Sequence, residues 1–157
     1  MILEDVTEFV TSLANYAPLA GLDLGTKTIG ISVSDAGHMI ATPLETIKRT
    51  KFQADAKRLL EITDHRQIGG LVLGLPRNMD GSEGPRAQAT RAFARNLTRL
   101  TDLPITYWDE RLSTVAAERA LLEADTSRKR RAEVIDHVAA GVILQGLLDR
   151  LRNLKDA

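Results

Sequence analysis

The most constraining feature of this sequence is the stretch of residues 21–35, GLDLGTKTIGISVSD. We interpret it as a buried strand, a tight turn at Gly25, and a second strand paired back onto the first. Asp23 interrupts the apolar first strand, and a buried carboxylate is costly unless a positive group meets it. The stretch therefore predicts a metal ion or a phosphate beside Asp23.

Composition limits the classes of protein that remain. The 157 residues are most simply one domain, and 43% hydrophobic with 27% charged residues is typical of a soluble globular protein. The net charge of zero argues against a strongly basic coat but allows a local basic patch. The absence of cysteine excludes disulfides, thiolate zinc sites and a cysteine nucleophile.

Targeting signals are not visible in the sequence. No apolar run approaches the roughly 18 residues of a membrane span, so we expect no membrane contact. The N-terminus carries Glu4, Asp5 and Glu8 where a signal peptide would be positively charged. We therefore expect a cytoplasmic protein.

Hydrophobic periodicity predicts alternating strands and helices. We expect one domain over residues 1–157, with an N-terminal helical extension over 1–17 and a core over about 18–151. Pro43 indicates that the third strand lies at a sheet edge. The expected strands are 19–24, 28–34, 39–47, 71–75 and 105–108, and the expected helices are 2–16, 52–65, 86–100, 114–124 and 132 or 133 to 151.

This order predicts the fold class. The first three strands form an antiparallel meander, and the later strand–helix–strand links favour parallel pairing with right-handed crossovers. A mixed five-stranded sheet with helices on both faces satisfies both requirements. We therefore predict an α/β protein with the element order of the ribonuclease H-like fold.

Acidic residues occur at three sites where the pattern favours apolar or small residues. They are Asp23 in the first strand, the Asp109-Glu110 pair at the end of the last strand, and Asp136 near the start of the last helix. Converging carboxylates repel one another, and a divalent cation resolves this. Oxygen ligands suit Mg²⁺ or Mn²⁺, and two such ions can hydrolyse a phosphodiester.

Each acid also has a structural interpretation. Asp23 could form a turn or pair with Lys27, and Arg111 could simply satisfy Asp109. Asp136 near a helix start is favoured by the helix dipole without any catalysis. The joint placement of the acids is what favours a functional site.

Two further segments have the composition of phosphate-binding sites. The loop over residues 74–85 is rich in Pro, Asn, Asp and Gly, and its amides with Arg77 and Asn78 could hold a phosphate. Alternatively, it is a solvated loop of turn residues. The basic run Arg128-Lys129-Arg130-Arg131 could contact a nucleic-acid backbone or form a solvated loop, and both can hold.

With these residues in hand, the chain resembles the YqgF family, also called RuvX, of Holliday junction resolvase-like proteins. The resemblance covers nearly all of residues 21–150 in four motifs that occur in the expected order. The motifs are GLDLGTKTIGISVSD (21–35), LGLPRNMDGSEGP (73–85), DERLSTVAAERAL (109–121) and KRRAEVIDHVAAGVILQ (129–145).

The resemblance implies a ribonuclease H-like fold related to the RuvC resolvases. Family members resemble metal-dependent nucleases implicated in maturation of the small-subunit ribosomal RNA precursor, and some have been regarded as junction resolvases. Carried over by position, the acidic motif residues are Asp23, the Asp109-Glu110 pair and Asp136. Only one of Asp109 and Glu110 is expected to face the site, because neighbours on a strand point to opposite faces. We favour Glu110, with Asp109 as its substitute.

Two departures from the resembled families are visible. Many YqgF members carry Lys-Arg where this chain has Lys27-Thr28. RuvC-type resolvases place an acid at the end of the fourth strand, where this chain has Leu75-Pro76. The metal site therefore cannot copy that of RuvC residue for residue.

We hypothesise a metal-dependent endonuclease in which Asp23, Glu110 and Asp136 hold Mg²⁺ or Mn²⁺. The preferred substrate is RNA rather than DNA, with pre-ribosomal particles as possible partners, on the ground of the resemblance alone. The protein would be a monomer or homodimer, and a resolvase would need the dimer. The residues expected to position nucleic acid are Lys27, Arg77, Asn78, Arg111, Arg128, Lys129 and Arg130.

Three alternatives remain at this point. One is a Holliday junction resolvase acting on DNA, and another is a non-catalytic module that binds nucleic acid or a ribosome precursor. The third is an actin- or hexokinase-like nucleotide-binding protein, since residues 23–27 also resemble the first phosphate loop of that superfamily. That superfamily pairs two such domains around ATP, whereas this chain has one.

Overall fold

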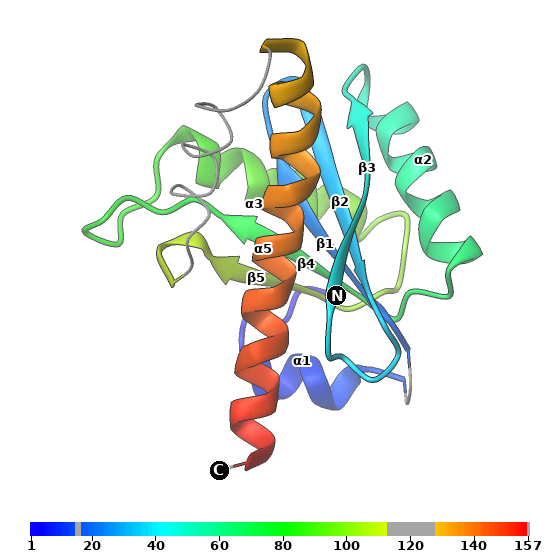
Figure 1. Cartoon of the computed structure of the whole chain (residues 1–157), viewed down its shortest axis with the longest axis vertical. Coiled ribbons are helices and arrows are strands. Elements are labelled where there is room, and N and C mark those ends of the chain that lie inside the picture. Colours follow the sequence, from blue (N-terminus) through cyan, green and yellow to red (C-terminus); the bar gives the residue numbers. More distant parts are fainter. Residues whose placement is uncertain (15–16, 113–127, 157) are drawn as a thin grey trace.

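The computed structural model describes residues 1–14, 17–112 and 128–156, with side chains of the last helix described over residues 137–154. The helix predicted over 114–124 lies outside this range. The elements are α1 (Val6–Ser12), β1 (Leu19–Leu24), β2 (Thr28–Ser34), β3 (Ala41–Lys48), α2 (Phe52–His65), β4 (Gly70–Leu75), α3 (Pro85–Leu97), β5 (Ile105–Asp109), the 3₁₀ turn η1 (Glu110–Leu112) and α5 (Arg128–Asp156) (Figure 1).

The five strands form one mixed sheet in the order β3-β2-β1-β4-β5. The pairs β1–β2 and β2–β3 are antiparallel, whereas β1–β4 and β4–β5 are parallel. This confirms the predicted meander followed by parallel strands. Pro43 lies on β3 at the edge of the sheet, also as predicted.

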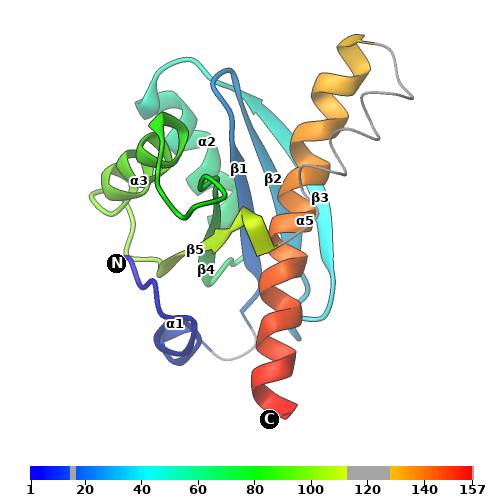
Figure 2. The same cartoon turned by 90° about the vertical axis from the view of Figure 1, so that its left-hand side faces the viewer.

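Side chains that alternate along the strands build a core on each face of the sheet. Leu22 of β1 and Leu73 of β4 are buried in the core that α2 and α3 cover. Leu19 of β1 and Val72 of β4 are buried on the other face, in the core that α5 and α1 cover. Figure 2 shows the sheet between α5 on one side and α2 with α3 on the other, which confirms the predicted helices on both faces.

Glycines bring α5 very close to the sheet. A Cβ atom on Gly21 of β1 would lie 2.7 Å from the Cβ of Leu144 in α5. A Cβ on Gly146 of α5 would lie 2.7 Å from the ring of Trp108 in β5. Larger residues at these positions would push the helix and the sheet apart.

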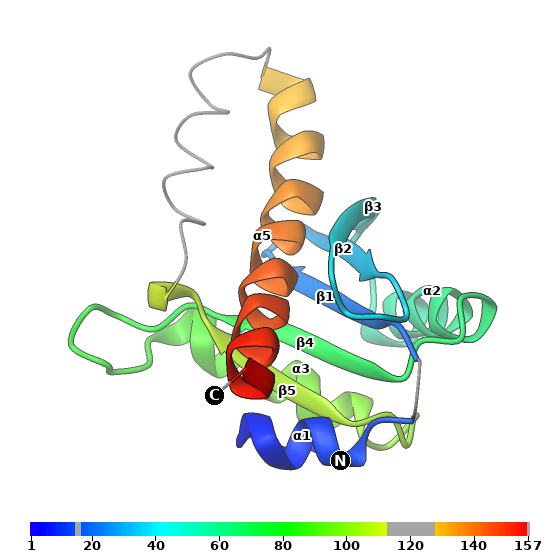
Figure 3. The ribbon, with the colours of Figure 1, turned by 60° about the horizontal axis from the view of Figure 1, so that its bottom comes forward.

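The N-terminal segment is not a helix over residues 2–16, so that prediction is wrong. Of the described residues 1–14, only Val6–Ser12 is helical, and the Asp5 carboxylate caps this helix by accepting from the amides of Thr7 and Glu8. The preceding residues are extended because they bond to β5, with the Leu3 amide 2.7 Å from the Ile105 carbonyl oxygen. Figure 3 shows α1 close to the β5 side of the sheet.

The third strand begins at Ala41 rather than at the predicted Met39. The amides of Met39 and Ile40 donate to the Asp35 carboxylate at 2.8 and 2.9 Å, so they leave the strand ladder. The turn capped by Asp35 therefore keeps Met39 and Ile40 out of β3, although their apolar side chains predicted a strand.

The last helix begins at Arg128, several residues before the predicted start at 132 or 133. The basic run over 128–131 is therefore helical, so the alternative in which it forms a solvated loop is wrong. Lysine and arginine are good helix formers, so the run extends the helix. Asp136 then lies about two turns inside α5, where the dipole of the helix terminus no longer accounts for it.

None of the described helices is both long enough and apolar enough to cross a membrane.

We expect Gly146→Ala to lower the free energy of unfolding by about 1–3 kcal/mol, because its methyl group would overpack Trp108. Gly141→Ala on the same helix is the matched control, since its Cβ would meet Pro43 at an ordinary 3.4 Å. Because alanine has a higher helix propensity than glycine, Gly141→Ala should leave the free energy of unfolding unchanged or raise it by up to about 1 kcal/mol. Urea unfolding of both variants measures the difference, and equal effects would contradict the close packing of Trp108.

Candidate metal and nucleic-acid site

Asp23 lies near the carboxyl end of β1, on the face of the sheet that α5 covers. The residue is 6% exposed. Across the antiparallel ladders it lies opposite Gly30 of β2, which lies opposite Thr46 of β3. These three residues form one row across the sheet. Gly30 contributes no side chain to this row, so Asp23 and Thr46 are the two residues whose side chains it presents toward α5.

Glu110 follows directly after β5 and lies on the same side of the sheet. Trp108 packs in the core under α5, so alternation directs Glu110 to the α5 side. A Cβ on Gly74 of β4 would lie 2.7 Å from Glu110 Oε1 and 2.4 Å from the Cδ1 atom of Ile143 in α5. The Glu110 carboxylate therefore lies over β4, against α5.

The strand register places Asp23 and Glu110 on the two sides of Gly74. The β1–β4 register pairs Leu22 with Leu73, so Asp23 and Gly74 are neighbours one residue further along. Paired strands lie about 4.8 Å apart. Asp23 on β1 and Glu110 after β5 thus flank Gly74 on β4, and the absent side chain at Gly74 is what lets the Glu110 carboxylate and Ile143 lie over this strand.

Asp136 belongs to the part of α5 that passes over the Asp23 row. The next residue, His137, has its Nδ1 atom 3.0 Å from Thr46 Oγ1 at the β3 end of that row. One turn further on, the carbonyl oxygen of Ala140 accepts from Ser32 Oγ at 2.7 Å. The backbone of Asp136 is therefore held near the row, while its side chain lies outside the described residues.

Asp109 faces away from this group of residues. Its neighbour on the strand, Tyr107, packs against the core under α2 and α3. The Arg111 guanidinium donates to both Asp109 oxygens, at 3.0 Å from Nε and 2.6 Å from Nη2. These bonds hold the pKa of Asp109 below its usual value. The structural interpretation of Asp109, as a carboxylate paired with Arg111, is therefore confirmed.

The donor set fits a hard divalent cation. Asp23 and Glu110 offer only carboxylate oxygens, the ligands that Mg²⁺ and Mn²⁺ prefer. Among the residues whose side chains are described, no three acidic, histidine or cysteine residues lie together as a metal site. A third protein ligand would therefore come from beyond that set, and Asp136 is the predicted one.

The loop after β4 is cross-linked to its surroundings. Arg77 lies 3.4 Å from Glu83 and 3.7 Å from Asp109, and Asn78 donates to Ser82 Oγ at 3.0 Å. The Arg91 guanidinium of α3 binds Glu83 and holds the pKa of that carboxyl below its usual value. Arg77, Asn78 and Arg111 all have intramolecular partners, so their role toward phosphate stays a prediction.

The remaining predicted nucleic-acid residues lie at the same end of the sheet. Lys27 is exposed on the β1–β2 turn. Arg128, Lys129 and Arg130 belong to the first turn of α5, and their side chains lie outside the described residues.

Two arginines that the sequence did not single out bind the turn after Asp23. Arg86 of α3 donates to the Leu24 carbonyl oxygen, and Arg49 Nη1 donates to the Gly25 carbonyl oxygen at 2.7 Å. Both reach the turn from distant parts of the chain, so no local pattern could have identified them. The one available signal for Arg86 is its place directly after Pro85, in the first turn of a helix.

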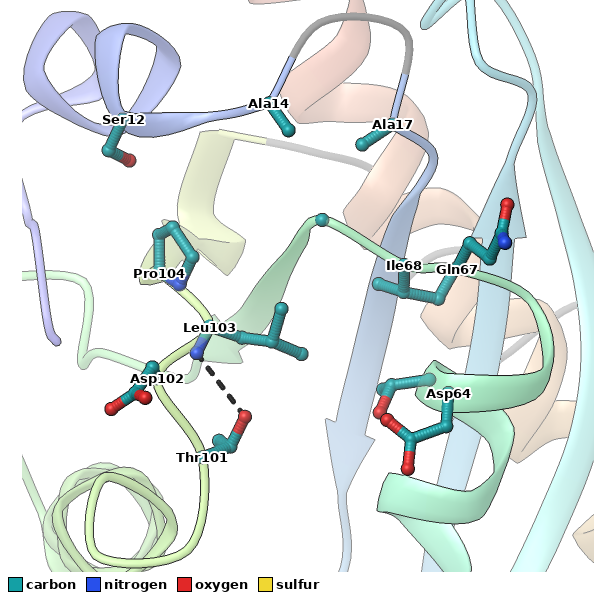
Figure 4. A pocket seen from close by; sticks show the side chains of 12 residues that line it. Ser12, Ala14, Ala17, Asp64, Gln67, Ile68, Thr101, Asp102, Leu103 and Pro104 are labelled. Carbon is teal, nitrogen blue, oxygen red and sulfur yellow. Dashed lines mark hydrogen bonds between the residues drawn. The ribbon is translucent and has the colours of Figure 1, made fainter.

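A pocket of about 630 Å³ lies at the opposite end of the sheet. Figure 4 shows it between the segment before β1, the end of α2 and the segment before β5, with Ala17, Gln67 and Leu103 among its walls. These segments lie at the amino ends of the parallel strands, whereas Asp23 and Glu110 lie at the carboxyl ends. The pocket is therefore separate from the candidate site.

Known proteins with this fold include RuvC of Thermus thermophilus. A structure described as RuvC in complex with a Holliday junction substrate matches with a TM-score of 0.53 at 12% identity, covering 87% of this chain and 96% of that one. A second Thermus thermophilus RuvC structure matches with a TM-score of 0.51 at 13% identity, covering 86% and 96%. The predicted ribonuclease H-like fold is confirmed.

Sequence relatives cover the whole chain. A Ruegeria pomeroyi protein named "Putative pre-16S rRNA nuclease" is 71% identical, over 98% of this chain and all of its own. A Paracoccus denitrificans protein of the same name is 72% identical, over 98% of both. The family model described as "RuvX: Holliday junction resolvase" matches residues 17–150. The chain belongs to the RuvX family.

Proposed function

We propose that this protein is a metal-dependent endonuclease that hydrolyses phosphodiester bonds during maturation of the small-subunit ribosomal RNA precursor. The observation that carries the proposal is the placement of Asp23 and Glu110 on the two sides of Gly74, on the face of the sheet that α5 covers. The names of the relatives from Ruegeria and Paracoccus support the nuclease activity and the RNA substrate.

In this proposal Asp23, Glu110 and Asp136 hold Mg²⁺ or Mn²⁺. When bound, the cation supplies an activated water and neutralises charge on the scissile phosphate. Asp23 and Glu110 orient the ion from two neighbouring parts of the sheet, and burial keeps bulk water away from Asp23. Arg86 and Arg49 fix the turn after Asp23 through its carbonyl oxygens, which limits movement of that carboxylate.

Residues 18–151 would form the catalytic core in this proposal, with residues 1–17 as an extension. The start of the family match at residue 17 supports this division. Within the described residues, the extension bonds to β5, packs against the cores on both faces of the sheet and pairs Glu4 with Arg91 of α3. It would therefore support the fold without touching substrate.

A second candidate function is resolution of DNA junctions, which the description of the matching family favours. Symmetric cutting of a junction requires two copies of the site related by a two-fold axis. A protein that stays monomeric at working concentration and cuts only RNA would exclude this candidate.

The test is cleavage of a substrate panel in Mg²⁺ or Mn²⁺. The panel contains precursor ribosomal RNA ends, single-stranded RNA, duplex DNA and a four-way DNA junction. We expect cleavage of the precursor RNA that stops in chelator. Preferential cutting of the junction would instead assign resolution.

We expect Asp23→Asn and Glu110→Gln to lower kcat by at least about 100-fold, since each removes a charged ligand of the cation. Asp109→Asn is the matched control, because its carboxylate binds Arg111 on the other side of β5. It should retain activity within about 10-fold while losing thermal stability. Equal loss of kcat in Asp109→Asn and Glu110→Gln would contradict the assignment of Glu110.

We expect Gly74→Ala to lower both activity and stability. Its Cβ would lie within 2.7 Å of Glu110 Oε1 and of Ile143, so the carboxylate must move. The free energy of unfolding should fall by about 1–3 kcal/mol, measured in urea. Cleavage should fall at saturating substrate, and a fully active Gly74→Ala enzyme would show that Glu110 does not act from this position.

A further inference from the structure

Exposed lysines gather at the end of the sheet beyond Asp23. The turn between β1 and β2 carries Lys27, Lys48 is the last residue of β3, and Lys51 lies in the following turn, directly before α2. The ladder pairs Thr28 with Lys48, and the Arg49 amide donates to the Lys27 carbonyl oxygen at 2.9 Å. The two turns therefore lie side by side, and we call Lys27, Lys48 and Lys51 the lysine rim.

Lys48 shares the face of the sheet with Asp23. Its neighbour Ile47 and the facing Ile29 are buried in the core under α2 and α3, so alternation directs Lys48 to the α5 side. Lys48 lies two residues beyond the Asp23 row and two strands away, about 7 Å along the strands and about 10 Å across them. The resulting separation of about 12 Å matches about three to four nucleotides of a stacked strand.

The backbone of the lysine rim is fixed by buried contacts. The Arg49 guanidinium donates to the Gly25 carbonyl oxygen and lies 5.7 Å from the Phe93 ring centroid. The amide of Thr50 donates to Asp55, whose carboxylate is 3% exposed. The rim therefore presents its lysines from a preorganised backbone, with the nearby acid buried beneath it.

The ammonium groups of the lysine rim have no carboxylate partners among the described residues. On the other side of the site, Arg77, Arg91 and Arg111 are each paired with a carboxylate. The lysine rim is therefore available to an external polyanion.

We propose that the lysine rim binds backbone phosphates of the nucleic-acid strand on the β3 side of the scissile phosphate. Lys48 and Lys51 are thereby assigned to substrate binding, beside the predicted Lys27. This inference rests on the proposed function and extends it by giving the path of the bound nucleic acid over the protein. The path runs from the carboxylates across β2 to the β3–α2 turn. Lysine contacts to phosphates are independent of sequence, so the rim would add affinity rather than base preference.

The experiment measures binding separately from cleavage. A fluorescent single-stranded RNA is titrated with the Asp23→Asn protein, the parent, over a series of KCl concentrations. The same titration is carried out with the rim variant, which is the parent with Lys48→Gln and Lys51→Gln added. The matched control carries Arg66→Gln and Arg99→Gln, two exposed cations at the opposite end of the sheet. Both pairs remove two charges from exposed side chains, and thermal unfolding checks that both variants fold.

Each lost phosphate contact should reduce the slope of log affinity against log salt by about 0.7, so the rim variant should lose about 1.4. At 0.1 M salt this corresponds to about 25-fold weaker binding. The control variant should keep its slope within about 0.3. Equal slopes for the rim and control variants, or no RNA binding by the parent protein, would overturn the proposal.

The two proposals fail in different ways. A smaller salt dependence of binding in the rim variant, with no cleavage by the wild-type protein, would support RNA binding by the lysine rim and reject the nuclease activity. Cleavage by the wild-type protein, with an unchanged slope in the rim variant, would retain the nuclease and reject the rim.

Discussion

The arrangement of this protein depends on the close contact between α5 and the sheet. Side chains are absent where the two layers approach most closely, at Gly21 and Gly74 on the strands and at Gly146 on the helix. Close approach lets Leu144 and Ile143 pack directly on the strand backbones, which gains dispersion contacts that a wider gap would lose. The same contact also sets the distance between α5 and Asp23. A change in the packing of this core would therefore also change the positions of the carboxylates.

Much of the fold follows from sequence periodicity. The burial of β1 and β4 on both faces, the meander and the edge position of β3 all agree with patterns in the chain. The extended N-terminus does not, because backbone bonds from Leu3 to Ile105 determine its conformation. The early start of α5 was also missed, since the charged run at 128–131 is compatible with either a loop or a helix.

The candidate site was partly predictable for the same reason. Alternation showed that Asp109 and Glu110 point in opposite directions, but the sequence did not say which face of β5 meets α5. The structure decides this through Trp108, which packs against Gly146. The contacts from Arg86 and Arg49 to the turn after Asp23 join segments far apart in the chain, and single-sequence patterns carry no signal for such contacts.

The short N-terminal segment has a consequence for how copies of this protein can meet. An uncovered edge strand invites addition of a strand from another molecule. Residues 1–3 cover the outer side of β5 at its first residue, because the Leu3 amide donates to the Ile105 carbonyl oxygen and the Ile105 amide donates to the Met1 carbonyl oxygen. At the other edge, Pro43 and a register shift interrupt β3. Both edges of the sheet are thus interrupted, which disfavours the addition of a long strand from another copy.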